Sequence, residues 1–199
     1  MMEIDLDPLA ERETYALLTQ TIIPRPIAWV LTDNSLEGTA RWNLAPFSFF
    51  NGIASNPPML MFSIGSWDVH GRTKDTLVNL RKNPVFTIGI ACQSQENQVQ
   101  QSSSELPFGV SEVHEYGMSV TEWNWKTPLI DGCRINFACT VAKEVEIDDS
   151  SQILIFAKIS KIWVADEVVS KDSKDRISIN AKLVDPLLRL GAGKYGKLG

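Results

Sequence analysis

The stretch Asn43-Leu-Ala-Pro-Phe-Ser-Phe-Phe-Asn51 places a proline inside a run of aromatic and small residues. Aromatic residues favour strands, whereas proline cannot donate a ladder hydrogen bond and is confined to sheet edges or bulges. We therefore expect residues 40–54 to form one edge strand that bends at Pro46.

On either side of this stretch, short runs rich in β-branched and aromatic residues predict further strands. Turn residues such as Asn56-Pro-Pro58 and Asp148-Asp-Ser-Ser151 separate them, and the last two runs suit a long hairpin. The expected strands are 27–32, 59–64, 85–91, 134–147 and 153–169. At least five strands with few helices between them favour a closed antiparallel barrel, because closure removes exposed strand edges.

One helix is clearly indicated, over residues 74–82. Thr73 or Asp75 can cap its start, Leu77 and Leu80 share a face, and Asn83-Pro84 ends it. The polar residues 93–104 suit a surface helix, and residues 107–125 show only weak signals.

Composition narrows the class of protein. With 199 residues, 44% hydrophobic and 22% charged, the chain suits a single globular domain, 1–199, with a core over about 20–170 and a tail over 171–199. A net charge of −5 disfavours nucleic acid as a partner. The acidic start and the lack of a run of ~18 apolar residues favour a cytoplasmic protein that does not enter a membrane.

Two patterns suggest sites that the context argues against. Cys92, Cys133 and Cys139 include no CxxC pair, so we expect free buried thiols and no metal site. Residues 191–196 spell G-x-G-x-x-G, but a dinucleotide-binding fold needs a strand before this motif and a helix after it. The sequence ends at Gly199, and we expect these glycines to form a flexible tail.

The bent strand and the helix start together suit a ligand with a planar ring and a phosphate. Asn43, Ala45 and Ser48 can meet the polar edge of a ring. The phenylalanines of the same stretch can form a flat wall, although each is equally suited to the barrel core. Cationic side chains ahead of a helix, here residues 72–76, suit a phosphate, although alone they are also typical of a solvated surface.

Taken in order along the chain, these motifs resemble the flavin reductase-like family of FMN-binding split barrels, which includes the flavoredoxins. The similarity extends from about residue 25 to residue 195. It rests on Arg25-Pro-Ile27, Asn43 to Asn51, Asn56-Pro-Pro58, Phe62-Ser-Ile-Gly65, Lys74-Asp-Thr76 and Asn79, and more weakly on Pro107-Phe-Gly-Val110, Glu112, Gly117, Cys139, Arg189-Leu-Gly191 and Tyr195.

This resemblance implies a mainly β fold, an FMN-binding split β-barrel of antiparallel Greek-key type with a few short helices. It also implies a homodimer with two FMN molecules at the subunit interface. The residues that match the family's flavin contacts are Asn43, Ala45, Pro46, Phe47, Ser48 and Asn51. Those that match its ribityl phosphate contacts are Ser63, Arg72, Lys74, Asp75 and Thr76.

The implied activity is that of an NAD(P)H-dependent flavin oxidoreductase, with NADH or NADPH as a transient cosubstrate. Electrons would pass from FMN to free flavin, to a partner oxygenase or to a small acceptor, and no catalytic acid or base is required. Ala138 and Val113 depart from the family pattern, which leaves the substrate side open. The alternatives are a flavin-binding electron carrier without nicotinamide activity, and a barrel without flavin that serves as an interaction module.

Overall fold

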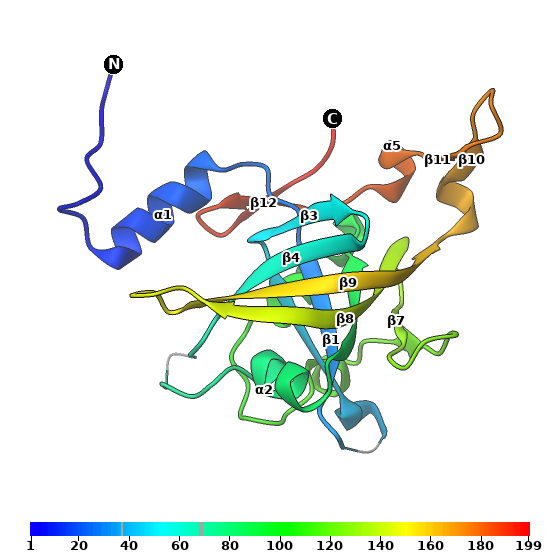
Figure 1. The fold of residues 1–199 in the computed structure, drawn as a ribbon, viewed down its shortest axis with the longest axis horizontal. Coiled ribbons are helices and arrows are strands. Elements are labelled where there is room, and N and C mark those ends of the chain that lie inside the picture. The colour runs from blue at the N-terminus through cyan, green and yellow to red at the C-terminus, as the bar shows by residue number, and fades with distance from the viewer. Residues whose placement is uncertain (37, 68–69) are drawn as a thin grey trace.

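The computed structural model of this protein describes residues 1–36, 38–67 and 70–199 (Figure 1). Its main feature is a seven-stranded antiparallel sheet with the order β2-β1-β5-β8-β9-β4-β3. The strands are β1 (Ala28–Asp33), β2 (Trp42–Phe47), β3 (Phe50–Ser55), β4 (Pro58–Gly65), β5 (Val85–Ile90), β8 (Ile135–Glu146) and β9 (Gln152–Val164). The two end strands, β2 and β3, follow one another in sequence, so the sheet curls into the expected split barrel.

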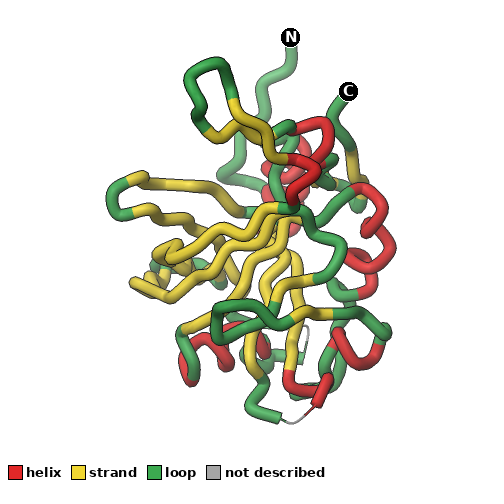
Figure 2. The backbone as a smooth tube through the Cα atoms, turned by 90° about the vertical axis from the view of Figure 1, so that its right-hand side faces the viewer, coloured by secondary structure: helices red, strands yellow, loops and turns green. Residues whose placement is uncertain are grey.

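Short helices and two-stranded hairpins surround this barrel, as Figure 2 shows. The helices are α1 (Glu11–Thr21), α2 (Asp75–Lys82), α3 (Glu96–Gln101), α4 (Glu112–Glu115) and α5 (Ala181–Val184), with 3-10 turns η1 (Gly38–Arg41), η2 (Gln93–Gln95) and η3 (Asp166–Val168). The small hairpins are β6 (Val120–Thr121) with β7 (Leu129–Ile130), β10 (Val169–Lys171) with β11 (Ile177–Ile179), and β12 (Leu188–Gly191) with β13 (Lys194–Gly196). Within the described ranges, no helix combines the length and apolar character needed to cross a membrane.

Strand β1 is buried on both faces and divides the apolar interior in two. Because side chains alternate along a strand, Ala28 and Val30 join one cluster and Trp29 and Leu31 join the other. The first cluster fills the barrel and includes Phe62 of β4. The second lies under the helices outside the barrel, so the outer helices are fixed to the sheet by a core of their own.

The strand predictions are confirmed except at two places. The strand expected over residues 153–169 ends at Val164, because residues 166–168 form η3. At the decisive stretch, one bent strand was expected over residues 40–54. That prediction was wrong, because the chain forms two strands, β2 and β3, separated at Ser48 and Phe49. Pro46 lies in β2 opposite Trp29, on an end strand of the sheet. The edge placement of the proline is therefore confirmed, while the chain breaks two residues after it.

Helix α2 is confirmed, and it is tied to β1 through a buried asparagine. The Nδ2 atom of Asn79 donates to Thr32 Oγ1 at 3.1 Å and to Asn34 Oδ1 at 2.7 Å. The helix expected over residues 93–104 is shorter, since it divides into η2 and α3 and ends at Gln101. The bonds of Asn79 thus hold α2 beside the end of β1.

The C-terminal glycines are part of the fold, so the expectation of a flexible tail there was wrong. Residues 188–196 form the β12–β13 hairpin, and α1 packs beside it in Figure 1. Gly191 has a φ of +80°, and a Cβ at this position would overlap the carbonyl oxygen of Thr19. Only glycine allows so close an approach between hairpin and helix.

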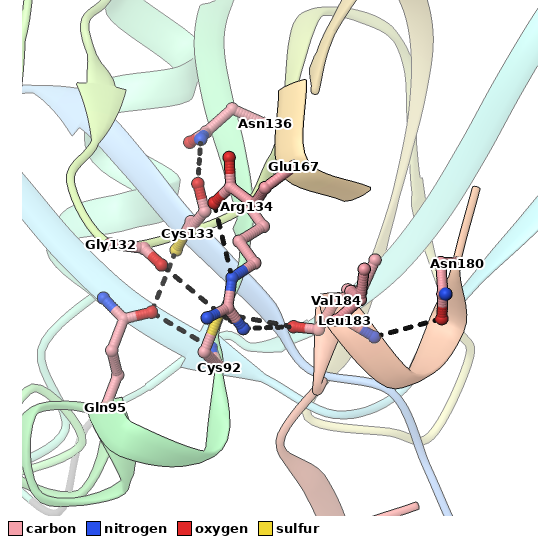
Figure 3. Close-up of polar contacts among 10 residues, drawn as sticks. All are labelled: Cys92, Gln95, Gly132, Cys133, Arg134, Asn136, Glu167, Asn180, Leu183 and Val184. Carbon is pink, nitrogen blue, oxygen red and sulfur yellow. Dashed lines mark hydrogen bonds and ion pairs between the residues drawn. The ribbon is translucent and has the colours of Figure 1, made fainter. Parts of the chain in front are cut away.

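A polar network around Arg134 attaches the segment before this hairpin to the barrel (Figure 3). Arg134 Nη1 donates to the carbonyl oxygen of Val184 at 3.3 Å, and its Nε lies 3.7 Å from Glu167 Oε1. Asn180 caps α5 by accepting from the amides of Lys182 and Leu183. All three cysteines are buried and free, as expected from the sequence.

Candidate functional site

Two adjoining cavities lie where β2, β4 and the start of α2 meet. The helix cavity, of about 130 Å³, opens at the N-terminus of α2. The hairpin cavity, of about 380 Å³, extends from β2 to the β12–β13 hairpin. Pro46, Phe47, Lys74 and Ser103 line both. Together the cavities have the size of a site for a small organic ligand, which spans about 300–1,000 Å³.

The helix cavity receives the first turn of α2. Lys74 occupies the N-cap position in an extended conformation and makes no capping hydrogen bond. A protonated amino group cannot accept a hydrogen bond, so the side chain of Lys74 does not cap the helix. Arg72 and Lys74 also line this cavity. Cationic side chains beside an uncapped helix N-terminus favour an anion.

Strand β2 and helix α2 meet through two buried polar side chains on the wall of the helix cavity. Asn43 Nδ2 donates to Thr76 Oγ1 at 3.1 Å, and the two residues are 1% and 2% exposed. The Thr76 hydroxyl accepts in this contact, so its own proton can be donated to another group. This bond fixes the position of both side chains relative to the start of α2.

Glu112 of α4 is a buried carboxyl group on the same wall. Its Oε2 accepts from the backbone N–H of Leu44 at 2.8 Å, and the residue is 7% exposed. Burial raises its pKa from the ordinary 4.5 to about 7, with a smaller contribution from the nearby negative charge of Asp75, and the hydrogen bond from Leu44 opposes this shift. Glu112 therefore changes charge near neutral pH beside the cavity.

The break between β2 and β3 faces the hairpin cavity with Phe47, Ser48 and Phe49. Arg25 supports it from behind, since its Nε donates to Ser48 Oγ at 3.4 Å and its guanidinium lies 5.8 Å from the centre of the Phe49 ring. Its Nη1 donates to the carbonyl oxygens of Thr19 and Ile22. These contacts of Arg25 fix the position of Ser48 and Phe49 between β2 and β3.

The turn between β8 and β9 supplies another side of the hairpin cavity. Ser63 of β4 donates through Oγ to Gln152 Oε1 at 2.7 Å. The hydroxyl of Ser66 donates to the carbonyl oxygen of Ser151 at 2.7 Å. An acidic turn, which the sequence indicated only as a hairpin connection, thereby adds Ser151 and Gln152 to the cavity wall.

The two ends of the chain complete this cavity with Tyr15 of α1, Arg189 of β12 and Tyr195 of β13. Arg189 and Arg25 exchange backbone hydrogen bonds of 3.0 and 2.9 Å, which brings the hairpin to the barrel. The guanidinium of Arg189 lies over the Tyr195 ring, with Cζ 4.5 Å from its centre. A cation and several aromatic faces therefore meet in one wall.

The structure brings ten of the eleven residues singled out from the sequence to these cavities. Asn51 is the exception, because it lies exposed on β3 and lines neither cavity. Those in the helix cavity are Asn43, Ala45, Pro46, Phe47, Arg72, Lys74, Asp75 and Thr76, and those in the hairpin cavity are Pro46, Phe47, Ser48, Ser63 and Lys74. Both sets converge on one continuous space.

Sequence reasoning missed several lining residues. Arg189, Tyr195 and Glu112 lie in motifs that supported the resemblance, but the motifs gave them no role. Tyr15 and Gln152 had no signal at all, because each reaches the site only through packing between distant segments. The arrangement suits an elongated ligand with a planar apolar part and an anionic end.

Comparison with known proteins agrees with this description. Residues 20–189 match the family model described as flavin reductase like domain. The protein YwrF of Bacillus subtilis (strain 168) is 29% identical over 198 residues, which cover 97% of this chain and 93% of that protein. The similarity thus extends over nearly the whole of both chains.

Solved structures share the fold. Component B of nitrilotriacetate monooxygenase from Bacillus cereus is similar with a TM-score of 0.84 and 28% identity, over 100% of this chain and 96% of that chain. The fold also matches 2-nitrobenzoate 2-nitroreductase NbaA from Pseudomonas fluorescens, with a TM-score of 0.82 and 23% identity over 98% of this chain and 91% of that chain. Fold, cavity and family model together lead to one conclusion: the chain belongs to the flavin reductase-like family.

Proposed function

We propose that this protein binds FMN and uses it as an NAD(P)H-dependent flavin reductase. The observation that supports this most strongly is the joined pair of cavities, with aromatic residues in one and an uncapped, cationic helix start in the other. The donor set fits a flavin mononucleotide, whose ring is planar and whose phosphate is a dianion. Family membership agrees with the same ligand.

The residues divide between the two parts of this ligand. Pro46, Phe47 and Phe49 offer an apolar wall, and Asn43, Ala45 and Ser48 offer polar groups at its edge. Bound FMN would supply a ring that accepts a hydride from a nicotinamide and passes electrons onward.

At the other end, Arg72, Lys74 and Thr76 would hold the phosphate. Thr76 suits this role because its hydroxyl accepts from Asn43 and keeps a proton to donate. The side chains then need only bind and orient the two reactants.

The name of one similar protein bears on the electron acceptor. The similar Bacillus cereus protein is named as component B of a monooxygenase. We propose that this chain passes electrons to free flavin, to a partner oxygenase or to a small acceptor. We propose a cytoplasmic location, because NADH and NADPH are both present there.

A homodimer is part of this proposal. Strand β3 ends the sheet, and five of its six residues are exposed, including Ile53 at 44%. An uncovered edge strand can pair with another chain. Sedimentation velocity of the flavin-loaded protein is expected to give a dimer, and a monomer that keeps its flavin would contradict a shared site.

The first experiment is an absorbance spectrum of the purified protein followed by anaerobic mixing with NADH or NADPH. We expect a flavin spectrum that bleaches within seconds of mixing. A flavin spectrum that survives both reductants would indicate an electron carrier. A colourless protein that leaves the fluorescence of added FMN unchanged would indicate a barrel without flavin function.

A further inference from the structure

The hairpin cavity has an unbalanced charge. Lys74 and Arg189 line it, and no aspartate or glutamate does so among the described residues. This contrasts with the whole chain, whose net charge is −5. Neither lysine nor arginine here forms an ion pair with a carboxylate of the described ranges. Cations held together without counter-charges favour an anionic ligand.

Lys74 is accounted for by the proposed phosphate, whereas Arg189 is not. Lys74 also lines the helix cavity beside Arg72, but Arg189 lies only in the hairpin cavity. Its Nη1 is buried and has no hydrogen-bond partner within the described part of the chain. A guanidinium nitrogen in that state is costly unless an acceptor reaches it.

Arg25 cannot serve as the anion-binding group in its place. Its Nη1 is used by the carbonyl oxygens of Thr19 and Ile22, and its Nε by Ser48. Burial lowers the pKa of Arg25, and the nearby positive charge of Arg189 lowers it further. The two guanidinium groups thus repel one another, and an anion beside Arg189 would relieve part of that repulsion.

One aromatic ring lies against the guanidinium of Arg189, and others line the same cavity. Tyr195 lies against it, and Tyr15 and Trp67 line the same cavity. Trp67 is 58% exposed, so one flat side chain stands at the open edge. Aromatic side chains with one cation suit a planar reactant that bears a negative charge.

We propose that Arg189 is the anion-binding residue of a second-reactant subsite in the hairpin cavity. This rests on the proposed function, because it takes the flavin phosphate to be held in the helix cavity. The anion is either the diphosphate of a nicotinamide nucleotide or the carboxylate of an aromatic acceptor. Tyr195 orients the guanidinium, and the backbone bonds to Arg25 fix the strand that presents it.

The test measures binding to the full-length protein loaded with FMN. Two probes that cannot be reduced, ADP and benzoate, are titrated by calorimetry at low salt against wild type, Arg189→Gln and Arg189→Lys. Arg176→Gln is the matched control, because Arg176 is an exposed arginine of the β10–β11 turn. Thermal unfolding monitors folding of each variant.

We expect Arg189→Gln to lower the affinity for at least one probe by about tenfold or more. Arg189→Lys is expected to lower that affinity less, and Arg176→Gln is expected to leave it unchanged. If Arg189→Gln loses binding of ADP alone, the anion is a nucleotide diphosphate. If it loses binding of benzoate alone, the anion is a carboxylate. The affinity for FMN is expected to stay within about twofold of wild type.

Three results would overturn the subsite. In one, wild type binds neither probe. In another, Arg189→Gln binds both as well as wild type. In the third, Arg189→Gln loses FMN, which would assign Arg189 to the flavin. None of these bears on whether the wild-type flavin is reduced by NAD(P)H, so failure of the subsite and failure of the proposed function remain distinct.

Discussion

The helix cavity and the hairpin cavity differ in both charge and origin. In the helix cavity, Arg72 and Lys74 stand among three acidic residues, Asp75, Glu105 and Glu112, whereas the described lining of the hairpin cavity has cations alone. The helix cavity is built from segments in the middle of the chain, and the hairpin cavity needs α1 and β12–β13 from its two ends. The family motifs therefore assigned roles to residues of both cavities, but to none of the residues that the two chain ends bring to the hairpin cavity.

The largest expected effect tests the phosphate end of the helix cavity. The double substitution Lys74→Ala with Thr76→Ala is expected to weaken FMN binding by about 2–4 kcal/mol, since each residue would lose a charge-assisted bond. A fluorescence titration measures this. Lys82→Ala, an exposed lysine at the far end of α2, is the control. Unchanged affinity in the double variant would remove the phosphate assignment.

The next effect concerns the contact between α1 and the β12–β13 hairpin, which completes the hairpin cavity. Gly191→Ala is expected to lower the free energy of unfolding by about 1–3 kcal/mol more than Gly193→Ala. Both glycines have a positive φ, of +80° and +77°, but an added Cβ overlaps Thr19 only at Gly191, and nothing lies within 4 Å at Gly193. Thermal or urea unfolding compares the two. Equal losses would mean that the hairpin does not depend on its contact with α1.

The buried carboxyl group of Glu112 in the helix cavity gives a pH dependence of stability. Because the pKa of Glu112 is about 7 in the folded protein and 4.5 ordinarily, the native state holds an extra proton between these values. Stability from this group therefore falls as pH rises through that window and is constant above it. Glu112→Gln is expected to remove this pH-dependent loss of stability, which amounts to about 3.5 kcal/mol at roughly 1.4 kcal/mol per pKa unit.

Urea unfolding on both sides of that window checks this prediction. The control is Glu115→Gln, which alters an exposed carboxylate of the same helix α4. We expect the control to follow the wild-type curve. If Glu112→Gln also follows the wild-type curve, burial does not shift the pKa of Glu112.

The smallest expected effect concerns the residue that the structure leaves outside both cavities. Asn51→Ala is expected to change FMN affinity by less than about 0.5 kcal/mol, because its side chain lines neither cavity. The same fluorescence titration measures this. A loss similar to that of the Lys74 and Thr76 variant would mean that Asn51 contacts FMN from the partner subunit.

Much of the barrel was predictable because its strands have local signals. The run 59–64 is a short apolar stretch between turns, and the run 85–91 is rich in β-branched residues. The long hairpin of β8 and β9 has both strands and turn in one stretch. Helix α2 was predictable for the same reason. The break at Ser48 and Phe49 was not, because it depends on which strands meet when the sheet curls into a barrel.

The sequence by itself determined the antiparallel barrel, helix α2 and the cluster of residues around Pro46 and Lys74, since each rests on neighbours in the chain. Only the tertiary structure decided that the terminal glycines form a hairpin against α1, that Gln152 reaches Ser63, and that Arg189 enters the cavity. The physical reason is that these contacts join residues far apart in sequence. No local pattern encodes them, and they form only when the whole chain packs.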